Sequence, residues 1–504
     1  MKKKYGISGF LGYKAEIGNL VIIHPGFNGL LMKVMLISML VLVVLLASVF
    51  DVQAQTVYCV RAGATGTNNG SDWNNAFSTL PATLVRGATY YIADGKYAAY
   101  KFDDSVSGTS VITIKKATAS DHGTEIGWDS SYGDGKATFE AITFATDDWV
   151  FDGVTGGGPG SWMSGHGFEV GPTNGASDVI TLSGARDNIT IRHVDAHVYP
   201  IVKSKEEMTI FKSVLRGTTG SCSNITFSYV WFHHAFGCGF HISQQWSGPA
   251  VLEYSYISHT AGMGNQHASA MSIYEGADNF TVRYNIFYDI QGTAFIAGLG
   301  YSSHLNNWEV YGNVFTHSGT FNVVVSAVIG VYYIESTPPR LIRSNNWKVY
   351  NNSIINVKGY ARMTWPDPEG TNIFVYNNLF DGNRTGPEYV NTVYISGPGV
   401  TWDYNWYTRT AHPRAYKPGP HENALYYGGY CNLSVDTTNY FVNWQNGDYR
   451  LSKATSTGKA LPSPCNHDMY SRMRGKDGVW DRGALEFSGS EFPPNPPKQL
   501  RIIQ

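Results

Sequence analysis

The chain has 504 residues, of which 43% are hydrophobic, 14% aromatic and only 15% charged, with 55 glycines and a formal charge of −2. This composition excludes a mainly helical or disordered protein and is typical of a β-rich extracellular one. The near-zero charge and the lack of a basic run also exclude a nucleic-acid-binding surface, so no nucleic-acid partner is expected.

The first recognisable segment, residues 32–50, has one lysine followed by a long apolar run. The sequence DVQA comes next and places Val52 and Ala54 at the small-residue positions before a cleavage site, which predicts a secretory signal peptide cut near Ala54. We therefore expect a secreted, periplasmic or cell-surface protein that leaves the membrane after cleavage. A transmembrane anchor is the alternative, but it needs about 20 apolar residues and the run is slightly shorter. Residues 1–31 are an over-extended start before Met32 or an unusually long basic leader.

The next segment predicts a cap for the structure that follows it. Ser71 or Asp72 can begin a short helix. On one face of that helix would lie Ala76, Phe77, Leu80 and Leu84. A stack of coils must cover its open end or expose its apolar interior, and an amphipathic helix provides such a cover.

A phrase rich in β-branched and aromatic residues then recurs at spacings of 26 to 39 residues. Its eight copies begin at Asn188, Asn224, Ala250, Asn279, Asn307, Asn346, Asn372 and Gly399. A repeat of this length indicates a solenoid in which each copy is one coil.

The later repeats carry the same residue types at the same positions. Six residues after the anchors stand Asn285, Asn313, Asn352, Asn378 and Asn405. Two residues further stand Phe287, Phe315, Ile354, Phe380 and Tyr407. In stacked coils such positions lie about 4.8 Å apart, so the asparagines would pass amide hydrogen bonds along the axis and the apolar column would fill the interior. Asparagine also tolerates the left-handed backbone of a tight corner. An antiparallel β-sandwich gives regular short strands too, but it does not explain these columns.

Both ends of the exported chain resemble those of secreted, pectate-lyase-like right-handed parallel β-helix proteins. The Gly/Asn-rich start and the strand that ends in ADGKY resemble the N-terminal cap of that group. The closing stretch, in which GDYRL leads to the phrase DRGALEF at Asp481–Phe487, is similar to the ending of many members. The resemblance covers about residues 57–488 and implies the fold. It implies little about activity, because the group includes polysaccharide lyases, glycoside hydrolases and members of unknown role.

Together these features predict an all-β protein, a right-handed parallel β-helix solenoid with a short N-terminal capping helix. The expected organisation is an over-extended start plus signal peptide at 1–54 (the signal itself at 32–54), a β-helix domain at 55–488 and a Pro-rich tail at 489–504. Within the domain we expect the cap and first coils at 55–150, central coils at 151–440 and a C-terminal coil or cap at 441–488. A monomer is expected.

All five cysteines lie in the exported part of the chain. An oxidising compartment permits disulfides between Cys431 and Cys465 and between Cys222 and Cys238, which would leave Cys59 over.

Seven of the fifteen histidines lie between His193 and His267, and the repeats align several of them. Nine residues after their anchors stand His197, His233 and His259, and seventeen residues after stand Lys205, His241 and His267. Neighbouring coils would bring such groups to about 5 Å from one another. Both columns lapse in later coils, which favours a functional role over a structural one for the cluster. A structural role remains the alternative for each single histidine.

These columns predict a site on the outer surface, where strand alternation sends His241 and His267 if their neighbours point inward. Gln244, Gln245, Trp246 and Glu275 would line the site, with Trp246 stacking on a sugar ring. Glycosidases usually need two carboxylates, and this zone offers few, because only Glu253 and Glu275 are acidic between residues 217 and 275. No metal ligand is predicted. A calcium ion is left open, although this zone offers no clear ligand cluster.

The remaining chemistry is proton transfer, which suits β-elimination from a uronate-containing polysaccharide. His241 or His267 would be the base, since the unperturbed pKa of histidine is near neutrality. Tyr274 would be the acid, and Lys205 or a protonated His233 or His259 would neutralise the charge that develops on the substrate.

Two other functions remain open at this point. One is a glycoside hydrolase that uses Glu275 and another carboxylate. The other is a non-catalytic protein that binds glycans or serves structurally at the cell surface. An enzyme should bring the aligned histidines together with Tyr274 and Trp246 at the surface, whereas a scaffold should bury or scatter them.

Overall fold

The computed structural model describes residues 56–489 apart from 172–177, 199–214, 218–219, 236, 244, 261–267, 299–303, 319–324, 332–341, 358–359, 383–391, 410–411, 414–417, 428–429 and 434–435. The predicted signal segment, Lys205, Gln244, His267 and residues 490–504 lie outside the described residues. No helix in the described part of the chain has the length and apolar character needed to cross a bilayer.

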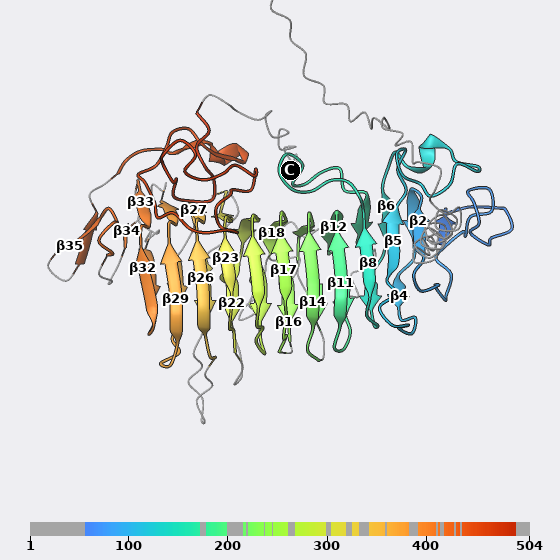
Figure 1. Cartoon of the computed structure of the whole chain (residues 1–504), viewed down its shortest axis with the longest axis horizontal. Coiled ribbons are helices and arrows are strands. Elements are labelled where there is room, and N and C mark those ends of the chain that lie inside the picture. Colours follow the sequence, from blue (N-terminus) through green and yellow to red (C-terminus); the bar gives the residue numbers. More distant parts are fainter. Residues whose placement is uncertain are drawn as a thin grey trace, which may run out of the picture. The chain divides into compact units, whose positions relative to one another are not determined.

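Successive coils add strands to three parallel sheets, named A, B and C below (Figure 1). Within the described residues sheet A has 12 strands and sheets B and C have 11 each. Each strand pairs with its equivalents in the coils before and after it, so the colours in Figure 1 advance along the row of strands from the N-terminal to the C-terminal coils. Parallel strands of successive coils that pair in three sheets form a parallel β-helix, and the hand of such crossovers is right-handed, which confirms the sequence prediction.

Sheet A consists of β1 (Val57–Val60), β2 (Thr89–Ile92), β5 (Ile112–Lys116), β8 (Trp149–Asp152), β11 (Asp187–Arg192), β14 (Ser223–Ser228), β17 (Ala250–Glu253), β20 (Phe280–Arg283), β23 (Glu309–Tyr311), β26 (Asn345–Tyr350), β29 (Thr371–Tyr376) and β32 (Val400–Asp403). Sheet B consists of β3 (Gly95–Tyr97), β6 (Ala137–Phe139), β9 (Phe168–Val170), β12 (Val194–His197), β15 (Trp231–His233), β18 (Tyr256–Thr260), β21 (Ile286–Ile290), β24 (Val314–Thr316), β27 (Ser353–Ile355), β30 (Leu379–Asp381) and β33 (Trp406–Thr408).

Sheet C consists of β4 (Tyr100–Phe102), β7 (Ile142–Phe144), β10 (Ile180–Leu182), β13 (Leu215–Gly217), β16 (Phe240–Ile242), β19 (Met271–Ile273), β22 (Gly292–Gly298), β25 (Val325–Val331), β28 (Tyr360–Thr364), β31 (Thr392–Ser396) and β34 (His412–Pro413). Two antiparallel hairpins follow, β35 (Ala424–Tyr427) with β36 (Tyr430–Leu433) and β37 (Phe441–Asn443) with β38 (Asp448–Leu451). The 3-10 turns are η1 (Ser130–Tyr132) and η3 (Trp444–Asn446).

The predicted asparagine column forms a fully buried ladder. The Nδ2 group of each asparagine donates to the Oδ1 of the next, at 3.0 Å from Asn285 to Asn313, 3.0 Å from Asn313 to Asn352, 3.0 Å from Asn352 to Asn378 and 2.9 Å from Asn378 to Asn405. Each Nδ2 also donates to a strand carbonyl, such as that of Leu252 for Asn285 at 2.8 Å. A net hydrogen bond is worth about 1 kcal/mol, so the ladder both stabilises the stack and fixes its register.

The predicted apolar column lies inside the coils. The rings of Phe287 and Phe315 stack with centroids 4.9 Å apart, and those of Phe380 and Tyr407 stack at 5.3 Å. These spacings match the separation of neighbouring strands, which confirms that repeats 26 to 39 residues apart are stacked coils.

The left-handed corner residue stands one position earlier than expected. The residues just before the ladder asparagines have φ between 51° and 67°: Tyr284, Gly312, Asn351, Asn377 and Tyr404. The ladder asparagines instead direct their amides inward, where they satisfy backbone groups of the corner.

Residues 71–86 form bends and a β-bridge in place of the predicted capping helix. Asp72 starts a single turn, because its Oδ1 accepts a hydrogen bond at 2.8 Å from the backbone three residues later. The turn does not continue, because the backbone of Phe77 pairs with β1. Leu80 and Leu84 are still buried in the core. The segment therefore covers the apolar end as expected, in an irregular conformation.

The predicted disulfides are not formed in the described structure. Cys222 precedes β14 of sheet A, and its thiol donates to the Gly184 carbonyl at 3.8 Å. Cys238 precedes β16 of sheet C, and its thiol donates to the hydroxyl of Ser272 at 3.0 Å. Cys465 is also a buried thiol.

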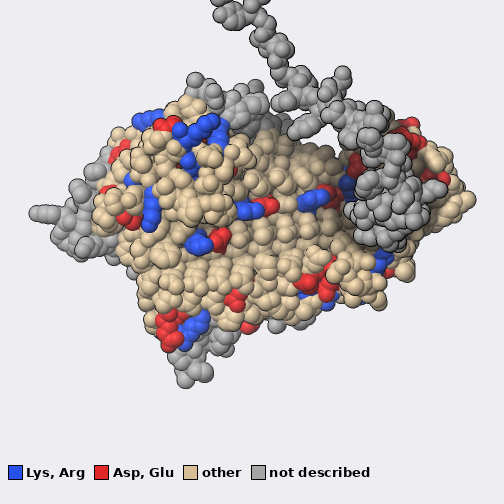
Figure 2. Space-filling model, viewed as in Figure 1, with Lys and Arg blue, Asp and Glu red and all other residues tan. Residues whose placement is uncertain are grey.

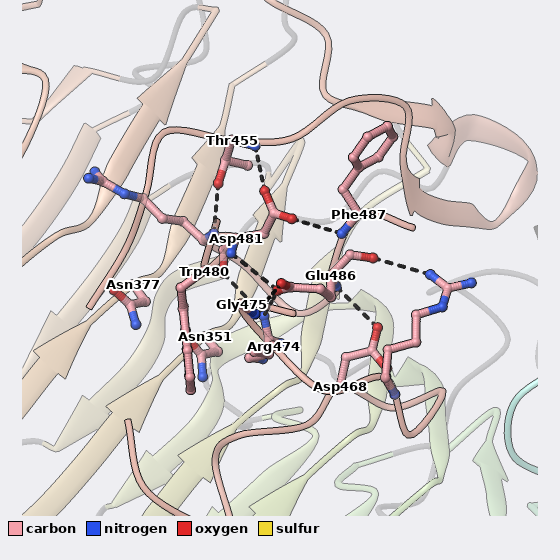
Figure 3. A network of polar contacts seen from close by, with 12 residues as sticks. Asn351, Asn377, Thr455, Asp468, Arg474, Gly475, Trp480, Asp481, Glu486 and Phe487 are labelled. Carbon is pink, nitrogen blue, oxygen red and sulfur yellow. Dashed lines mark hydrogen bonds and ion pairs between the residues drawn. The ribbon is translucent and has the colours of Figure 1, made fainter. Parts of the chain in front are cut away.

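The closing segment packs on the outer face of sheet B. Tyr440, Trp444 and Trp480 join one apolar cluster with outward residues of β18 to β30. Figure 3 shows the polar network that holds this segment, in which Asp481 and Glu486 accept backbone hydrogen bonds. The sequence phrase at Asp481–Phe487 is thus a closure that covers one face of the β-helix.

Sheet A presents a different outer face. Its charged side chains stand mostly as isolated pairs of opposite charge, visible as adjacent blue and red groups in Figure 2. Arg192 contacts Asp152 at 2.7 Å, Arg283 contacts Glu253 at 2.6 Å and Lys348 contacts Glu309 at 2.6 Å. Because each of these cations has a carboxylate on the neighbouring strand, this face offers little unpaired charge to a ligand.

Candidate functional site

The structure divides the predicted histidines between two sheets. His233 and His259 lie on β15 and β18 of sheet B, whereas His241 lies on β16 of sheet C. The two predicted columns therefore do not form one site. The split follows from the coil itself, because a turn between sheets separates His233 from His241.

The register also corrects the first column. Ala250 pairs with Ile225, so the repeat at Ala250 begins one position later in the coil than its neighbours. His233 consequently pairs with Ser258, and His259 stacks on His234 with ring centroids 4.8 Å apart. The repeat that begins at Ala250 lacks the anchor asparagine, so its start was counted one residue too late. This offset wrongly aligned His259 with His233.

On sheet B an ion-pair network occupies the outward positions of β9, β12 and β15. The carboxylate of Asp195 accepts a hydrogen bond from Nε2 of His233 at 2.8 Å and forms an ion pair with Nζ of Lys136 at 2.8 Å. Lys136 also contacts Glu169 at 3.0 Å, and Glu169 lies 3.6 Å from His197 Nε2. Burial opposes ionisation of Asp195, but His233 and Lys136 outweigh it and hold the pKa of this carboxyl well below its usual range.

The sheet B histidines have the environment of structural groups. His233 is 3% exposed and stacks on Trp231 at 3.7 Å, and burial lowers its pKa. Burial also lowers the pKa of His259 to about 4. Asp195 and the ring of Trp231 surround His233, and the rings of His234 and Tyr288 surround His259, so both histidines connect neighbouring coils.

On sheet C the outward row contains a different group. His241 pairs in register with Arg216 on β13 and with Ser272 on β19. Its ring lies 4.9 Å from that of Tyr274, which directly follows β19. The guanidinium of Arg216 is partly exposed and lies 3.6 Å from Asp178. A base, a phenol and a guanidinium thus come together on one face of the β-helix.

His241 is 9% exposed, and its charge state follows from its surroundings. Burial first, and then the nearby charge of Arg216, lower its pKa to about 4. The ring is therefore neutral at physiological pH, and burial and the charge of Arg216 both oppose its protonation. The sequence correctly paired His241 with Tyr274.

Arg216 is the member of this cluster that sequence reasoning missed. Counting seventeen residues from the anchors placed Lys205 and His267 beside His241, but Arg216 and Ser272 hold those positions. The signal that could have found Arg216 is the extra length of that repeat, which is about ten residues longer than its neighbours. If the count allows for an insertion in this repeat, the residue that aligns with His241 is Arg216 and not Lys205.

The structure places the predicted binding residues in different environments. Trp246 is fully buried and stacks on Phe280 inside the coils, so it cannot stack on a sugar as predicted. Its backbone bridges that of Ala277 and directs the ring inward. Gln245 hydrogen-bonds the backbone of His304 at 3.2 Å and 3.3 Å, which ties two coils together. Glu275 is half-buried and follows Tyr274 at the end of β19.

No group of three or more His, Cys, Asp or Glu side chains in the described ranges is placed to hold a metal ion. Residues that would bind calcium are thus not identified in the described part of the protein.

The chain is thus a right-handed parallel β-helix in which His241, Tyr274 and Arg216 lie near one another on one outer face. No protein-family model matches the chain, and no curated protein matches it. Among solved structures, pectate lyase Pel9A is similar with 13% identity and a TM-score of 0.41, over 87% of this chain and 98% of that one.

The PL6 family alginate lyase AlyGC is similar with 12% identity and a TM-score of 0.33, over 76% of this chain and 57% of that one. A mutant of AlyGC gives 11% identity and a TM-score of 0.32, over 70% and 55%. The chain thus spans just over half the length of the alginate lyase. At such identities these likenesses concern the fold alone.

Proposed function

We propose that the protein is a secreted lyase that cleaves a uronate-containing polysaccharide by β-elimination on the outer face of sheet C. The observation that carries the proposal is the contact of His241 with Tyr274 beside Arg216. These three side chains supply the base, the acid and the cation that the reaction needs. Secretion through the segment at 32–54 is part of the same proposal, since such polymers lie outside the cell.

Arg216 would bind the carboxylate of the uronate and stabilise the negative charge that builds up on it. His241 would remove the proton from C5, and the electrons of that C–H bond would delocalise into the carboxylate as an enolate. Their return would form the C4–C5 double bond as the bond from C4 to the glycosidic oxygen breaks. Tyr274 would give its proton to that leaving oxygen, and solvent would restore both side chains.

The charge of Arg216 bears on the charge state of His241. Burial first, and then this charge, lower the pKa of His241 and keep the imidazole neutral before the reaction, which is the form that a base requires; a substrate carboxylate bound to Arg216 would offset that charge as the proton is taken up. The same charge is complementary to the substrate dianion, which exists only during the reaction. One cation therefore serves both steps, and interactions that strengthen in the transition state raise kcat.

The test is to incubate the purified protein with acidic and neutral polysaccharides and to follow both unsaturated products and new reducing ends. A lyase gives ultraviolet absorbance from the new double bond together with reducing ends. Reducing ends without that absorbance would indicate a hydrolase, and binding without either product would indicate a glycan-binding protein; both outcomes contradict the proposal.

The matched variants are Tyr274→Phe and Tyr288→Phe. Each tyrosine lies beside a histidine, since Tyr288 is 5.6 Å from His259 on sheet B. Loss of the acid in Tyr274→Phe should lower kcat about 100-fold. Tyr288→Phe should retain the activity of the unchanged protein.

A further inference from the structure

The outer face of sheet C continues from His241 toward the N-terminal coils as one register row of polar side chains. Successive strands from β4 to β19 place in this row Lys101, Thr143, Thr181, Arg216, His241 and Ser272. On the later strands β22 and β25 the row continues with Ala297 and Gly330. Thr364 on β28 and Ser396 on β31 follow in the row, so its charged groups and its unbroken run of polar side chains lie on the side of Lys101.

Exposure divides the row at the same place. Lys101 is exposed, with 62% of its side chain open to solvent, and Thr143, Thr181 and Arg216 are partly exposed. Ser272 and Ala297 are fully buried, and Tyr274 packs on a small apolar cluster that contains Ala297. A ligand at His241 thus has accessible surface along this row on the side of Lys101. On the other side Ser272, Ala297 and Gly330 are buried, and exposed surface returns only at Thr364 and Ser396.

We propose that a single acidic polysaccharide chain lies along this row from His241 toward β4, with Lys101 binding a carboxylate at its far end. The inference rests on the proposed function for the acidic nature of the chain. Three strand spacings separate Lys101 from Arg216, which is about 14 Å. The polymer axis would run parallel to the axis of the β-helix, so that successive sugars meet successive coils.

The chemistry of the row fits such a ligand. Two cations stand at its ends, and the hydroxyls of Thr143 and Thr181 between them can bond the hydroxyls of the intervening sugars. Lys101 contacts Asp103 at 3.0 Å, but both side chains are largely exposed, so this pair is weak and a substrate carboxylate can replace it. Lys101 differs in this from Arg216 and from the cations of sheet A, whose carboxylate partners are partly or fully buried.

The experiment uses uronate oligomers of increasing length with the full-length protein and two variants, Lys101→Ala and Lys96→Ala. Lys96 is an exposed lysine of the same coil, but it lies on β3 of sheet B and serves as the matched control. Both kcat/KM and the dissociation constant are measured for every oligomer, so the inference is tested with or without cleavage.

For the unchanged protein, affinity and kcat/KM should rise with oligomer length until the chain reaches Lys101. Lys101→Ala should lower the affinity and kcat/KM about threefold for long oligomers and leave both unchanged for short ones. Lys96→Ala should match the unchanged protein at all lengths.

The outcomes separate the two proposals. Cleavage that is insensitive to Lys101→Ala at every length would overturn the inference and leave the lyase function standing. A length-dependent effect of Lys101 on binding without any cleavage would support the inference and overturn the lyase function. No binding of any oligomer would overturn both.

Discussion

Two histidine–tyrosine pairs lie on neighbouring sheets of the same β-helix, and their surroundings differ. On sheet B, His259 lies beside Tyr288 and stacks on His234, next to an ion-pair network whose charges are matched. On sheet C, His241 lies beside Tyr274 and a partly exposed Arg216. The closing segment covers much of sheet B, whereas sheet C is open over its first strands. Residue type alone therefore does not identify a site, because the two pairs differ in the charged partners beside them.

The largest expected effect concerns the cation that only the sheet C pair has. Arg216→Ala should lower kcat about 100- to 1,000-fold, because the developing charge on the substrate loses its stabilising partner. Arg192→Ala is the control, since Arg192 is a paired and partly exposed arginine of sheet A. Equal activity of the two variants in steady-state assays would remove Arg216 from the mechanism.

The sheet B network should respond in stability instead of activity. Asp195→Ala leaves Lys136 and His233 without their shared carboxylate, so the free energy of unfolding should fall by about 3 kcal/mol. The kcat of the folded fraction should not change. Chemical denaturation and a rate corrected for the folded fraction test this, and a loss of kcat with full stability would place the functional site on sheet B.

The buried ladder offers a comparison between two positions of one repeat. Asn352→Ala should lower the free energy of unfolding by about 2 kcal/mol, because it leaves buried amide and carbonyl groups of neighbouring coils unpaired. Asn372→Gly removes an exposed asparagine side chain that bonds Asn346 at 3.1 Å and keeps a residue that tolerates the φ of 56° at this position, so it should cost less than about 0.5 kcal/mol. Similar losses for both variants in urea titrations would contradict the role given to the buried ladder.

The smallest effect concerns pH and the closing segment. Burial raises the pKa of Glu486 to about 7, so between its unfolded pKa and pH 7 the folded state binds more protons than the unfolded state. Stability from this group is therefore greatest at acidic pH and falls as the pH rises through 7. The melting temperature should fall from pH 5 to pH 8, and less so in Glu486→Gln. Parallel pH curves for the two proteins would show that Glu486 does not contribute.

The sequence predicted the stacked coils well because the repeat has a strong local signal. An asparagine such as Asn352 bonds equivalent positions in both neighbouring coils, so the same residue must recur at the same place. The closing phrase could be located but not explained, because the partners of Asp481 and Glu486 come from residues that only the fold brings near.

The side-chain cluster on sheet C was predicted in part. His241 and Tyr274 belong to neighbouring coils, and the sequence correctly placed them close together. Arg216 was missed because an insertion of about ten residues shifts the count, and Trp246 was misassigned because alternation at a strand end does not determine which way a ring points. The capping helix failed for a similar reason, since pairing of Phe77 with β1 outweighs local helix propensity.

The most direct measurement is the time course of ultraviolet absorbance as the protein acts on an acidic polysaccharide, with His241→Ala compared with His259→Ala. The account predicts that the unsaturated product accumulates with the unchanged protein and with His259→Ala, and that His241→Ala is slower by at least about 100-fold. Undiminished accumulation with His241→Ala, or its loss with a folded His259→Ala, would contradict the account.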